Sequence, residues 1–415
     1  MTKVTSVLII GAGQAGLALS WSLSRRGVDH LLLERGRVAE RWQSERWPGL
    51  HLLTPNWMNR LPGPWAESDP NGFMSAASFA QRLIDYRAAI AAPVVGGCEV
   101  RSVRRQNGLF RVEAGERHWL ARAVVIATGA CDRPAVPEWA AALPQEIAQI
   151  SPTCYRGAAG LAKDGVLVVG ASATGVQLAA EIQASGRPVT LAVGRHVRMP
   201  RSYRGREIFS LLSGSGFLAA PRPANADPQY LMSLPSLQLT GSDGGAALGL
   251  DRLAAMGVRL VGRALGVRGN ALMLDPDPGL EIAAAERRRQ RVLEHLDADL
   301  AQRGMALPAD PEAWHAPHLP KHGPALLDLR REGIGSVVWA TGFRRSYPWL
   351  HLPVLDSAGE LQTQGGLTAV PGLYALGLPF MRHRASSFIY GAGRDAEALA
   401  PLIAAALGRT ASLAA

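Results

Sequence analysis

A glycine-rich turn near the start of the chain carries the first residues with an evident chemical use. The turn reads Gly11-Ala12-Gly13-Gln14-Ala15-Gly16. Gly11 permits a tight turn, Gly13 lets the backbone approach a pyrophosphate, and Gly16 lets a helix pack closely on a strand. The free N–H groups at the start of that helix would then face the phosphate charge. The spacing predicts a dinucleotide site rather than a plain glycine-rich connection.

Glu34 adds the acid that such a site needs. It follows Gly16 by 18 residues, where its carboxylate can accept hydrogen bonds from ribose hydroxyls. The same charge would repel a 2′-phosphate, so this first site predicts FAD or NAD. Because the chain begins with this unit and repeats it later, we expect FAD here and a nicotinamide dinucleotide at the second site.

The second glycine-rich turn, Gly170-Ala171-Ser172-Ala173-Thr174-Gly175, has Ser172 in place of the middle glycine. At the position of the acid this unit has Arg195, and a guanidinium is the group expected for a 2′-phosphate. The sequence therefore favours NADPH over NADH. The alternative is that Arg195 is only a solvated charge.

Buried strands must position both turns. Six apolar runs are predicted strands: residues 4–10, 28–33, 123–129, 166–169, 189–193 and 336–342. Helices are expected after each glycine-rich turn, which gives two βαβ units and therefore parallel sheets. The runs at 123–129 and 336–342 both end in Ala-Thr-Gly.

These elements predict an α/β protein with two Rossmann-like dinucleotide-binding domains. The FAD-binding domain is expected to be discontinuous, with residues 1–160 plus 325–415, and the NAD(P)H-binding domain to be inserted as residues 160–325. Residues 213–250 are rich in Gly, Ser, Pro and Asn and predict an irregular excursion. Residues 283–303 predict an amphipathic helix.

Composition excludes several classes of protein. The 415 residues are 47% hydrophobic and 19% charged, which suits a large core and excludes wholesale disorder. The net charge is +10, but the arginines are scattered, and Arg287-Arg288-Arg289 reads as a solvated helix face, so no nucleic-acid partner is expected. Without a long apolar stretch or a signal-peptide pattern, the chain predicts no membrane partner and a cytoplasmic location.

Cysteine and histidine usage narrows the chemistry further. Cys98, Cys131 and Cys154 have no C-x-x-C spacing, which argues against a disulfide scaffold, a thiol redox pair and a Cys-rich zinc site. The three histidines within residues 315–322 lie in a proline-rich segment without a carboxylate or cysteine. No metal is expected.

Taken together, these motifs resemble the flavin-containing monooxygenase-like family of FAD- and NAD(P)H-dependent oxidoreductases, which includes the plant YUCCA enzymes. The resemblance covers nearly the whole chain. It is carried by the glycine-rich turns, Glu34, Arg41-Trp42, residues 48–55, the Ala-Thr-Gly strands and residues 386–391. It implies an enzyme that reduces FAD with NADPH, forms a flavin C4a-hydroperoxide from O₂, and passes one oxygen atom to an N-, S- or C-centre of a small organic substrate. A homodimer is left open.

The resemblance places Trp42, His51 and Asn56 beside the flavin as candidate catalytic residues. Trp42 could cover one ring face, while His51 and Asn56 could hydrogen-bond a peroxide or a flavin carbonyl. The alternatives are a core role for Trp42 and a satisfied loop histidine at 51. The expected cofactor-binding residues are Gly11, Gly13, Gln14, Ala15, Gly16, Glu34, Arg35, Arg41, Trp42, Thr54, Val100, Thr128, Gly129, Gly170, Ser172, Ala173, Thr174, Gly175, Arg195, Thr341 and Gly342.

Other readings stay open at this point. The Baeyer–Villiger fingerprint is degenerate, because Ile150 stands where that family has histidine. A flavin-dependent NAD(P)H oxidase or reductase without oxygen insertion is a second alternative, and a slowly reacting flavoprotein sensor is a third. The disulfide reductases share the two-domain plan but need a pair of redox cysteines. Residues 382–384, Arg-His-Arg, could hold an anionic substrate group or the cofactor's phosphates, with surface charge as an equal alternative.

Overall fold

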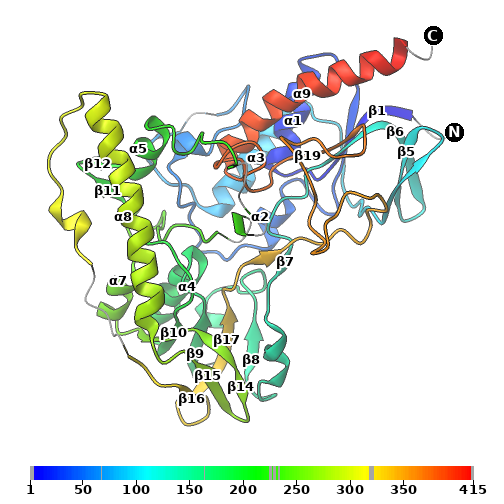
Figure 1. Cartoon of the computed structure of the whole chain (residues 1–415). Coiled ribbons are helices and arrows are strands. Elements are labelled where there is room, and N and C mark those ends of the chain that lie inside the picture. Colours follow the sequence, from blue (N-terminus) through cyan, green and yellow to red (C-terminus); the bar gives the residue numbers. More distant parts are fainter. Residues whose placement is uncertain are drawn as a thin grey trace.

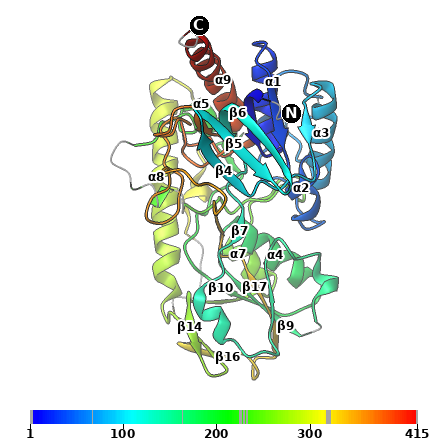
Figure 2. The same cartoon turned by 90° about the vertical axis from the view of Figure 1, so that its right-hand side faces the viewer.

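The structure is a computed structural model that describes residues 4–412, except 67, 163, 224–226, 228–229, 232–233 and 317–321. Two lobes lie one above the other, each built around its own sheet (Figure 1). Both ends of the described chain lie in the upper lobe, and the long helix α8 (Pro278–Gln302) runs alongside both lobes (Figure 2).

The sheet of the first lobe has the order β3-β2-β1-β6-β5-β4, with β19 also paired to β6. Its strands are β1 (Val4–Ile10), β2 (His30–Leu33), β3 (Val94–Val95), β4 (Ser102–Gln106), β5 (Leu109–Ala114), β6 (Arg117–Ile126) and β19 (Leu373–Ala375). The parallel pairs are β1 with β2, β2 with β3, β1 with β6, and β19 with β6. The antiparallel pairs are β4 with β5 and β5 with β6. The apolar run of β1 is buried because helices cover the sheet.

Four α-helices accompany this sheet: α1 (Gln14–Ser24), α2 (Glu40–Ser44), α3 (Ala76–Ala89) and α9 (Ile389–Ser412). The helices α1 and α9 pack against each other, so the two ends of the chain complete one lobe. The short helix η1 (Asn56–Met58) lies in the connection to α3.

The second lobe has a parallel sheet in the order β13-β10-β9-β17-β8. Its strands are β8 (Ala148–Ile150), β9 (Gly165–Val169), β10 (Val189–Ala192), β13 (Arg259–Val261) and β17 (Ile334–Trp339). A smaller antiparallel sheet contains β14 (Ala264–Arg268), β15 (Ala271–Leu274) and β16 (Leu326–Asp328). Helices α4 (Ala173–Ala184) and α7 (Leu250–Ala255) pack on this sheet, and the short helices η2 (Glu138–Ala142), η3 (Ala158–Gly160) and η4 (Pro311–Trp314) lie in its connections. Helix α5 (Ile208–Gly214) instead packs with α8 beside the first lobe (Figure 1).

Two short two-stranded ribbons remain. The strands β11 (Ser202–Tyr203) and β12 (Arg206–Glu207) form a hairpin before α5. The strands β7 (Arg133–Pro134) and β18 (Phe343–Arg344) pair where the chain passes between the two sheets in each direction.

The predicted α/β class with two dinucleotide-type sheets is confirmed, but the sheets divide the chain differently from the expected limits at 160 and 325. The strand β8 precedes residue 160 and β17 follows residue 325, yet both belong to the second sheet. The strand before the second Ala-Thr-Gly, β17, therefore belongs to the same sheet as β9, the strand that leads into the second glycine-rich turn. Within the part of the chain that the structure describes, no helix is both long and apolar enough to cross a membrane.

Candidate active site

The two glycine-rich turns have the same backbone geometry. Gly11 and Gly170 both have φ of +109°, a left-handed conformation that side chains rarely adopt. A Cβ added at Gly16 would lie 2.0 Å from the carbonyl oxygen of Gly11, and one added at Gly175 would lie 1.8 Å from that of Gly170. Glycine at these positions is what lets α1 and α4 approach their strands.

The two turns differ at the middle position. A Cβ added at Gly13 would meet no atom within 4 Å, and Gly13 lines the large cavity described below. No side chain caps the start of α1, so its first N–H groups are available to an anion. Ser172 also precedes its helix without capping it, and its hydroxyl donates to the carbonyl of Ser236 at 3.2 Å instead.

Glu34 is fixed against the first turn. Its Oε2 accepts the N–H of Ala12 at 2.8 Å, and its Oε1 accepts that of Gly36 at 3.1 Å. The residue is only 8% exposed, and it lines the cavity. Since each carboxylate oxygen has two lone pairs, acceptor capacity remains for ribose hydroxyls.

A cavity of about 1180 Å³ connects the two turns. The predicted residues that line it are Gly11, Gly13, Gln14, Ala15, Glu34, Arg35, Arg41, Trp42, His51, Thr54, Val100, Thr128, Gly129, Ala173 and Thr174. The predicted residues outside its lining are Gly16, Asn56, Gly170, Ser172, Gly175, Arg195, Thr341 and Gly342. The cavity is large enough for extended organic ligands, and the starts of α1 and α4 both line it.

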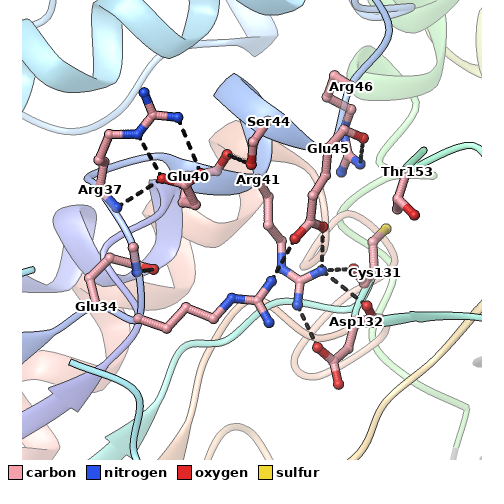
Figure 3. A network of polar contacts seen from close by, with 12 residues as sticks. Glu34, Arg37, Glu40, Arg41, Ser44, Glu45, Arg46, Cys131, Asp132 and Thr153 are labelled. Atoms are coloured by element: carbon pink, nitrogen blue, oxygen red, sulfur yellow. Dashed lines mark hydrogen bonds and ion pairs between the residues drawn. The ribbon is translucent and has the colours of Figure 1, made fainter. Parts of the chain in front are cut away.

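Arg41 is held by acidic partners rather than left free for a phosphate. Its guanidinium pairs with Glu45 at 2.8 Å and with Asp132 at 2.5 Å, and it also donates to the carbonyl of Cys131 (Figure 3). Arg35 reaches the other oxygen of Glu45 at 2.6 Å. This network joins α2 to the segment after β6, so Arg41 shapes the cavity wall.

Trp42 and His51 both reach the cavity. The indole N–H of Trp42 donates to Oε1 of Gln14 at 3.1 Å, and its ring packs edge-on against Phe79. The Nδ1 of His51 lies 3.2 Å from the carbonyl oxygen of Gly49. The Nε2 of His51 has no hydrogen-bond partner among the described residues and is available to a ligand.

Asn56 does not join them. Its Nδ2 donates to the carbonyl of Asp69 at 2.9 Å, and its Oδ1 accepts the N–H of Met74 at 3.1 Å. Both polar atoms of this buried amide hold the loop before α3. This use contradicts the expectation that Asn56 hydrogen-bonds a peroxide or a flavin carbonyl. Thr54 lines the cavity while its hydroxyl donates to Asn59 at 2.7 Å.

Arg195 stands at the end of β10, just behind the cavity wall. Its guanidinium carbon lies 5.9 Å from the ring centroid of Tyr230, which lines the cavity. The neighbouring Arg198 pairs with Glu286 and Asp251 at 3.4 and 3.5 Å, so its charge is already met. Thr341 and Gly342 lie at the crossover between the lobes, where the hydroxyl of Thr341 donates to the carbonyl of Ala135.

The sequence did not single out Arg288 and Arg291 as part of a site, whereas it named Arg384, within residues 382–384, as able to hold an anion. Arg288 and Arg291 line the cavity from α8, and Arg384 lines it from the segment before α9. Arg289 is 1% exposed and pairs with Glu286 at 2.5 Å. The interpretation of 287–289 as a solvated helix face is therefore wrong for Arg289, whereas Arg287 is exposed as expected. The signal was available, because Arg288 precedes Val292 of the predicted apolar face by one helical turn.

The cysteines and histidines are the residues weighed for a metal or disulfide site in the sequence, and the structure places most of them. Cys98 is buried, Cys131 is half-buried and Cys154 is exposed, and all three are free thiols. Within the described ranges, no group of His, Cys, Asp or Glu is arranged to hold a metal ion. His318, one of the histidines weighed for a metal, lies outside the described residues.

Comparisons with known proteins agree with this geometry. The family model of the pyridine nucleotide-disulphide oxidoreductases matches residues 8–205. An uncharacterized CzcO-like oxidoreductase of Geobacillus kaustophilus is 28% identical over 403 residues, covering 96% of this chain and 98% of that protein. The indole-3-pyruvate monooxygenase YUCCA1 of Oryza sativa is 25% identical over 393 residues, covering 91% and 87%. A solved flavin-containing monooxygenase from Stenotrophomonas maltophilia has a TM-score of 0.64 at 21% identity, covering 97% and 99%.

Proposed function

We propose, from the premise that this chain is a flavoprotein oxidoreductase of the flavin-containing monooxygenase-like type, that it is an FAD-dependent, NADPH-reduced monooxygenase. It would insert one oxygen atom of O₂ into a nitrogen, sulfur or carbon centre of a small organic substrate. FAD and a nicotinamide dinucleotide are its cofactors. The observation that carries the proposal is one cavity that joins both glycine-rich turns and whose described lining contains no disulfide.

The first turn fits the pyrophosphate and ribose of FAD. Gly13 leaves open space where a Cβ would stand, the start of α1 has uncapped N–H groups, and Glu34 keeps spare acceptor capacity. When bound there, FAD supplies hydride acceptance from NADPH and electron transfer to O₂. The protein's own contribution is to bind, orient and exclude water.

Water exclusion is the step that decides between oxygenation and peroxide release. Six apolar lining residues pack in one hydrophobic cluster, which we call the distal chamber: Phe209, Leu212, Phe217, Leu218, Val292 and Phe388. Elsewhere in the lining Trp42 is held by Gln14, and His51 has an Nε2 without a partner among the described residues. A cavity with an apolar chamber and a hydrogen-bonding group at His51 suits transfer of an oxygen atom to an organic substrate.

The cysteines support oxygen rather than a disulfide as the electron acceptor. Cys98 and Cys131 line the cavity as separate free thiols, and Cys154 lies outside its lining. The described residues therefore hold no disulfide that electrons from NADPH could reduce. The overall reaction balances as substrate + O₂ + NADPH + H⁺ → oxygenated substrate + NADP⁺ + H₂O.

One experiment tests the proposal. The holoenzyme is reduced anaerobically with NADPH and mixed with O₂, and hydrogen peroxide and organic product are measured with and without an amine, a sulfide or a ketone. We expect peroxide to fall as product appears, at a constant sum per NADPH. Stoichiometric peroxide with every compound would make the protein an NADPH oxidase. A cytoplasmic location and a homodimer remain predictions.

A further inference from the structure

Arg384 places a guanidinium in the cavity wall without an acidic partner. Its Nε is buried and has no hydrogen-bond partner, and no ion pair engages the side chain among the described residues. Burial lowers the pKa of this guanidinium from its ordinary value, because few polar groups replace the water it has lost. A half-buried guanidinium whose buried Nε has no partner is costly unless an anion joins it in the working state.

Two aromatic rings flank this guanidinium. Its central carbon lies 4.2 Å from the ring centroid of Phe217 and 5.1 Å from that of Phe380. Contacts with ring faces hold the guanidinium plane but use none of its N–H groups. Those N–H groups form a fork that matches a carboxylate.

The backbone that carries Arg384 is fixed before any ligand arrives. The Arg384 N–H donates to the carbonyl of Ala220 at 2.9 Å. The hydroxyl oxygen of Ser386 accepts the N–H groups of Arg382 and His383, each at 3.0 Å. His383 in turn lies 3.1 Å from the buried carboxylate of Asp395 in α9. The guanidinium is therefore pre-organised, which reduces the entropy lost on binding an anion.

The acidic side chains of the cavity lining all come from early in the chain, where arginines accompany them: Glu34, Glu40, Glu45, Glu99 and Asp132 lie among Arg35, Arg41, Arg46 and Arg133. From residue 197 onward the described lining contains the cations Arg288, Arg291 and Arg384 and no acid. Arg384 therefore has no acidic lining residue from its own part of the chain to compete with an anionic ligand.

The three arginines do not serve the same ligand. Arg288 donates to the carbonyl of His196, next to Arg195, and so lies on the side of the second glycine-rich turn. Arg384 instead comes from the connection between β19 and α9, which touches the first turn where Gly377 approaches Ala15. Its guanidinium thus reaches the chamber from the flavin side.

We propose that Arg384 binds the carboxylate of the organic substrate, whose apolar body occupies the distal chamber. The inference rests on the proposed function and names its substrate class: small aryl or alkyl carboxylates with an oxidisable centre. A thioether carboxylate illustrates the balance, since the sulfur gains one oxygen atom of O₂, NADPH is oxidised to NADP⁺, and the other oxygen atom leaves as water. The carboxylate itself is unchanged.

Binding is tested first, on the FAD-loaded protein and without turnover. Phenylacetate and its neutral isostere phenylacetamide are titrated by calorimetry. We expect phenylacetate to bind about 10- to 100-fold more tightly, the range of a charge-assisted bidentate contact. Arg384→Gln should abolish this preference. Arg394→Gln removes the same charge from an exposed position on α9, outside the cavity lining, and should preserve it.

Turnover separates this inference from the proposed function. The probes are (phenylthio)acetate and its methyl ester, with sulfoxide as product, and the KM for NADPH is measured without organic substrate. Arg384→Gln should raise the KM for the acid, leave the KM for the ester unchanged and leave the KM for NADPH unchanged.

Equal binding of phenylacetate and phenylacetamide by the wild type would overturn the inference. A raised KM for NADPH in Arg384→Gln would assign the guanidinium to the dinucleotide's phosphates. Preferential phenylacetate binding without any sulfoxide would overturn the oxygenase and leave the anion site standing.

Discussion

The hydroxyl of Ser172 donates to the carbonyl of Ser236 at 3.2 Å, and this bond ties the second glycine-rich turn to the excursion that follows α5. Gln238 reinforces the tie, because its Nε2 donates to the carbonyl of Ala171 at 2.6 Å. Gln177 of α4 donates to the carbonyl of Leu239 at 3.0 Å. The excursion therefore lies against the turn at which the pyrophosphate of the nicotinamide dinucleotide is expected, and the cofactor must compete with these bonds.

We expect Ser172→Ala to lower the KM for NADPH. The alanine keeps the Cβ and removes the hydroxyl that holds the excursion in place. One hydrogen bond contributes about 0.5–1.5 kcal/mol, which corresponds to roughly a 2- to 10-fold change. Initial rates of NADPH oxidation measure it. Ser185→Ala, at the other end of α4, is the matched control. A raised KM in Ser172→Ala would mean that the hydroxyl itself contacts the cofactor.

Gly13→Val should give a folded but colourless protein. The added side chain meets no protein atom within 4 Å of its Cβ and φ is ordinary, so the fold tolerates it, but it fills the space of the pyrophosphate. Flavin content follows from absorbance near 450 nm, and circular dichroism checks the fold. Gly160→Val, also in open space but outside the cavity, should stay yellow. Full flavin occupancy in Gly13→Val would displace FAD from this turn.

The βαβ units could be predicted because their signals are local. The apolar run at 4–10 is β1 to the residue, and the glycine positions follow from short-range contacts between Gly16 and Gly11. Such patterns depend on neighbours within a single turn of chain, so one sequence is enough to recognise them.

The remaining features depend on tertiary contacts. The strand β17 joins the second sheet by pairing with β9, which lies about 170 residues earlier. Asn56 is used by Asp69 and Met74, so its side chain never reaches the cavity. Arg384 faces the chamber only because residues 218–220 pair with its segment. No local pattern distinguishes these arrangements from their alternatives.

Acid should destabilise the protein through two buried histidines. Burial lowers the pKa of both His30 and His196 below 6.5. Below about pH 6.5 the unfolded chain binds protons at these sites that the folded chain does not. The free energy of unfolding therefore falls as the pH falls, by up to about 1.4 kcal/mol per pH unit for each histidine.

Urea midpoints measured between about pH 7.5 and 5.5 check this sign. His30→Gln cannot take up the proton and retains a group able to bond Ser20, which lies 2.8 Å from the His30 Nε2. We expect a shallower loss of stability with acid in this variant. His351→Gln removes an exposed histidine and should follow the wild type. An unchanged slope in His30→Gln would contradict the assignment.

Arg195→Ala should raise the KM for NADPH far more than that for NADH. Arg195 is half-buried at the end of β10, the position at which a Rossmann-like unit meets the 2′ substituent of the ribose. Loss of a phosphate contact there corresponds to about 1.5–3 kcal/mol, or roughly 10- to 150-fold in KM for NADPH. Steady-state kinetics with both dinucleotides measure the difference. Arg198→Ala is the matched control, because Glu286 and Asp251 already neutralise that guanidinium, and it should not discriminate between the two cofactors. Equal effects of Arg195→Ala on NADPH and NADH would show that this arginine does not read the 2′-phosphate.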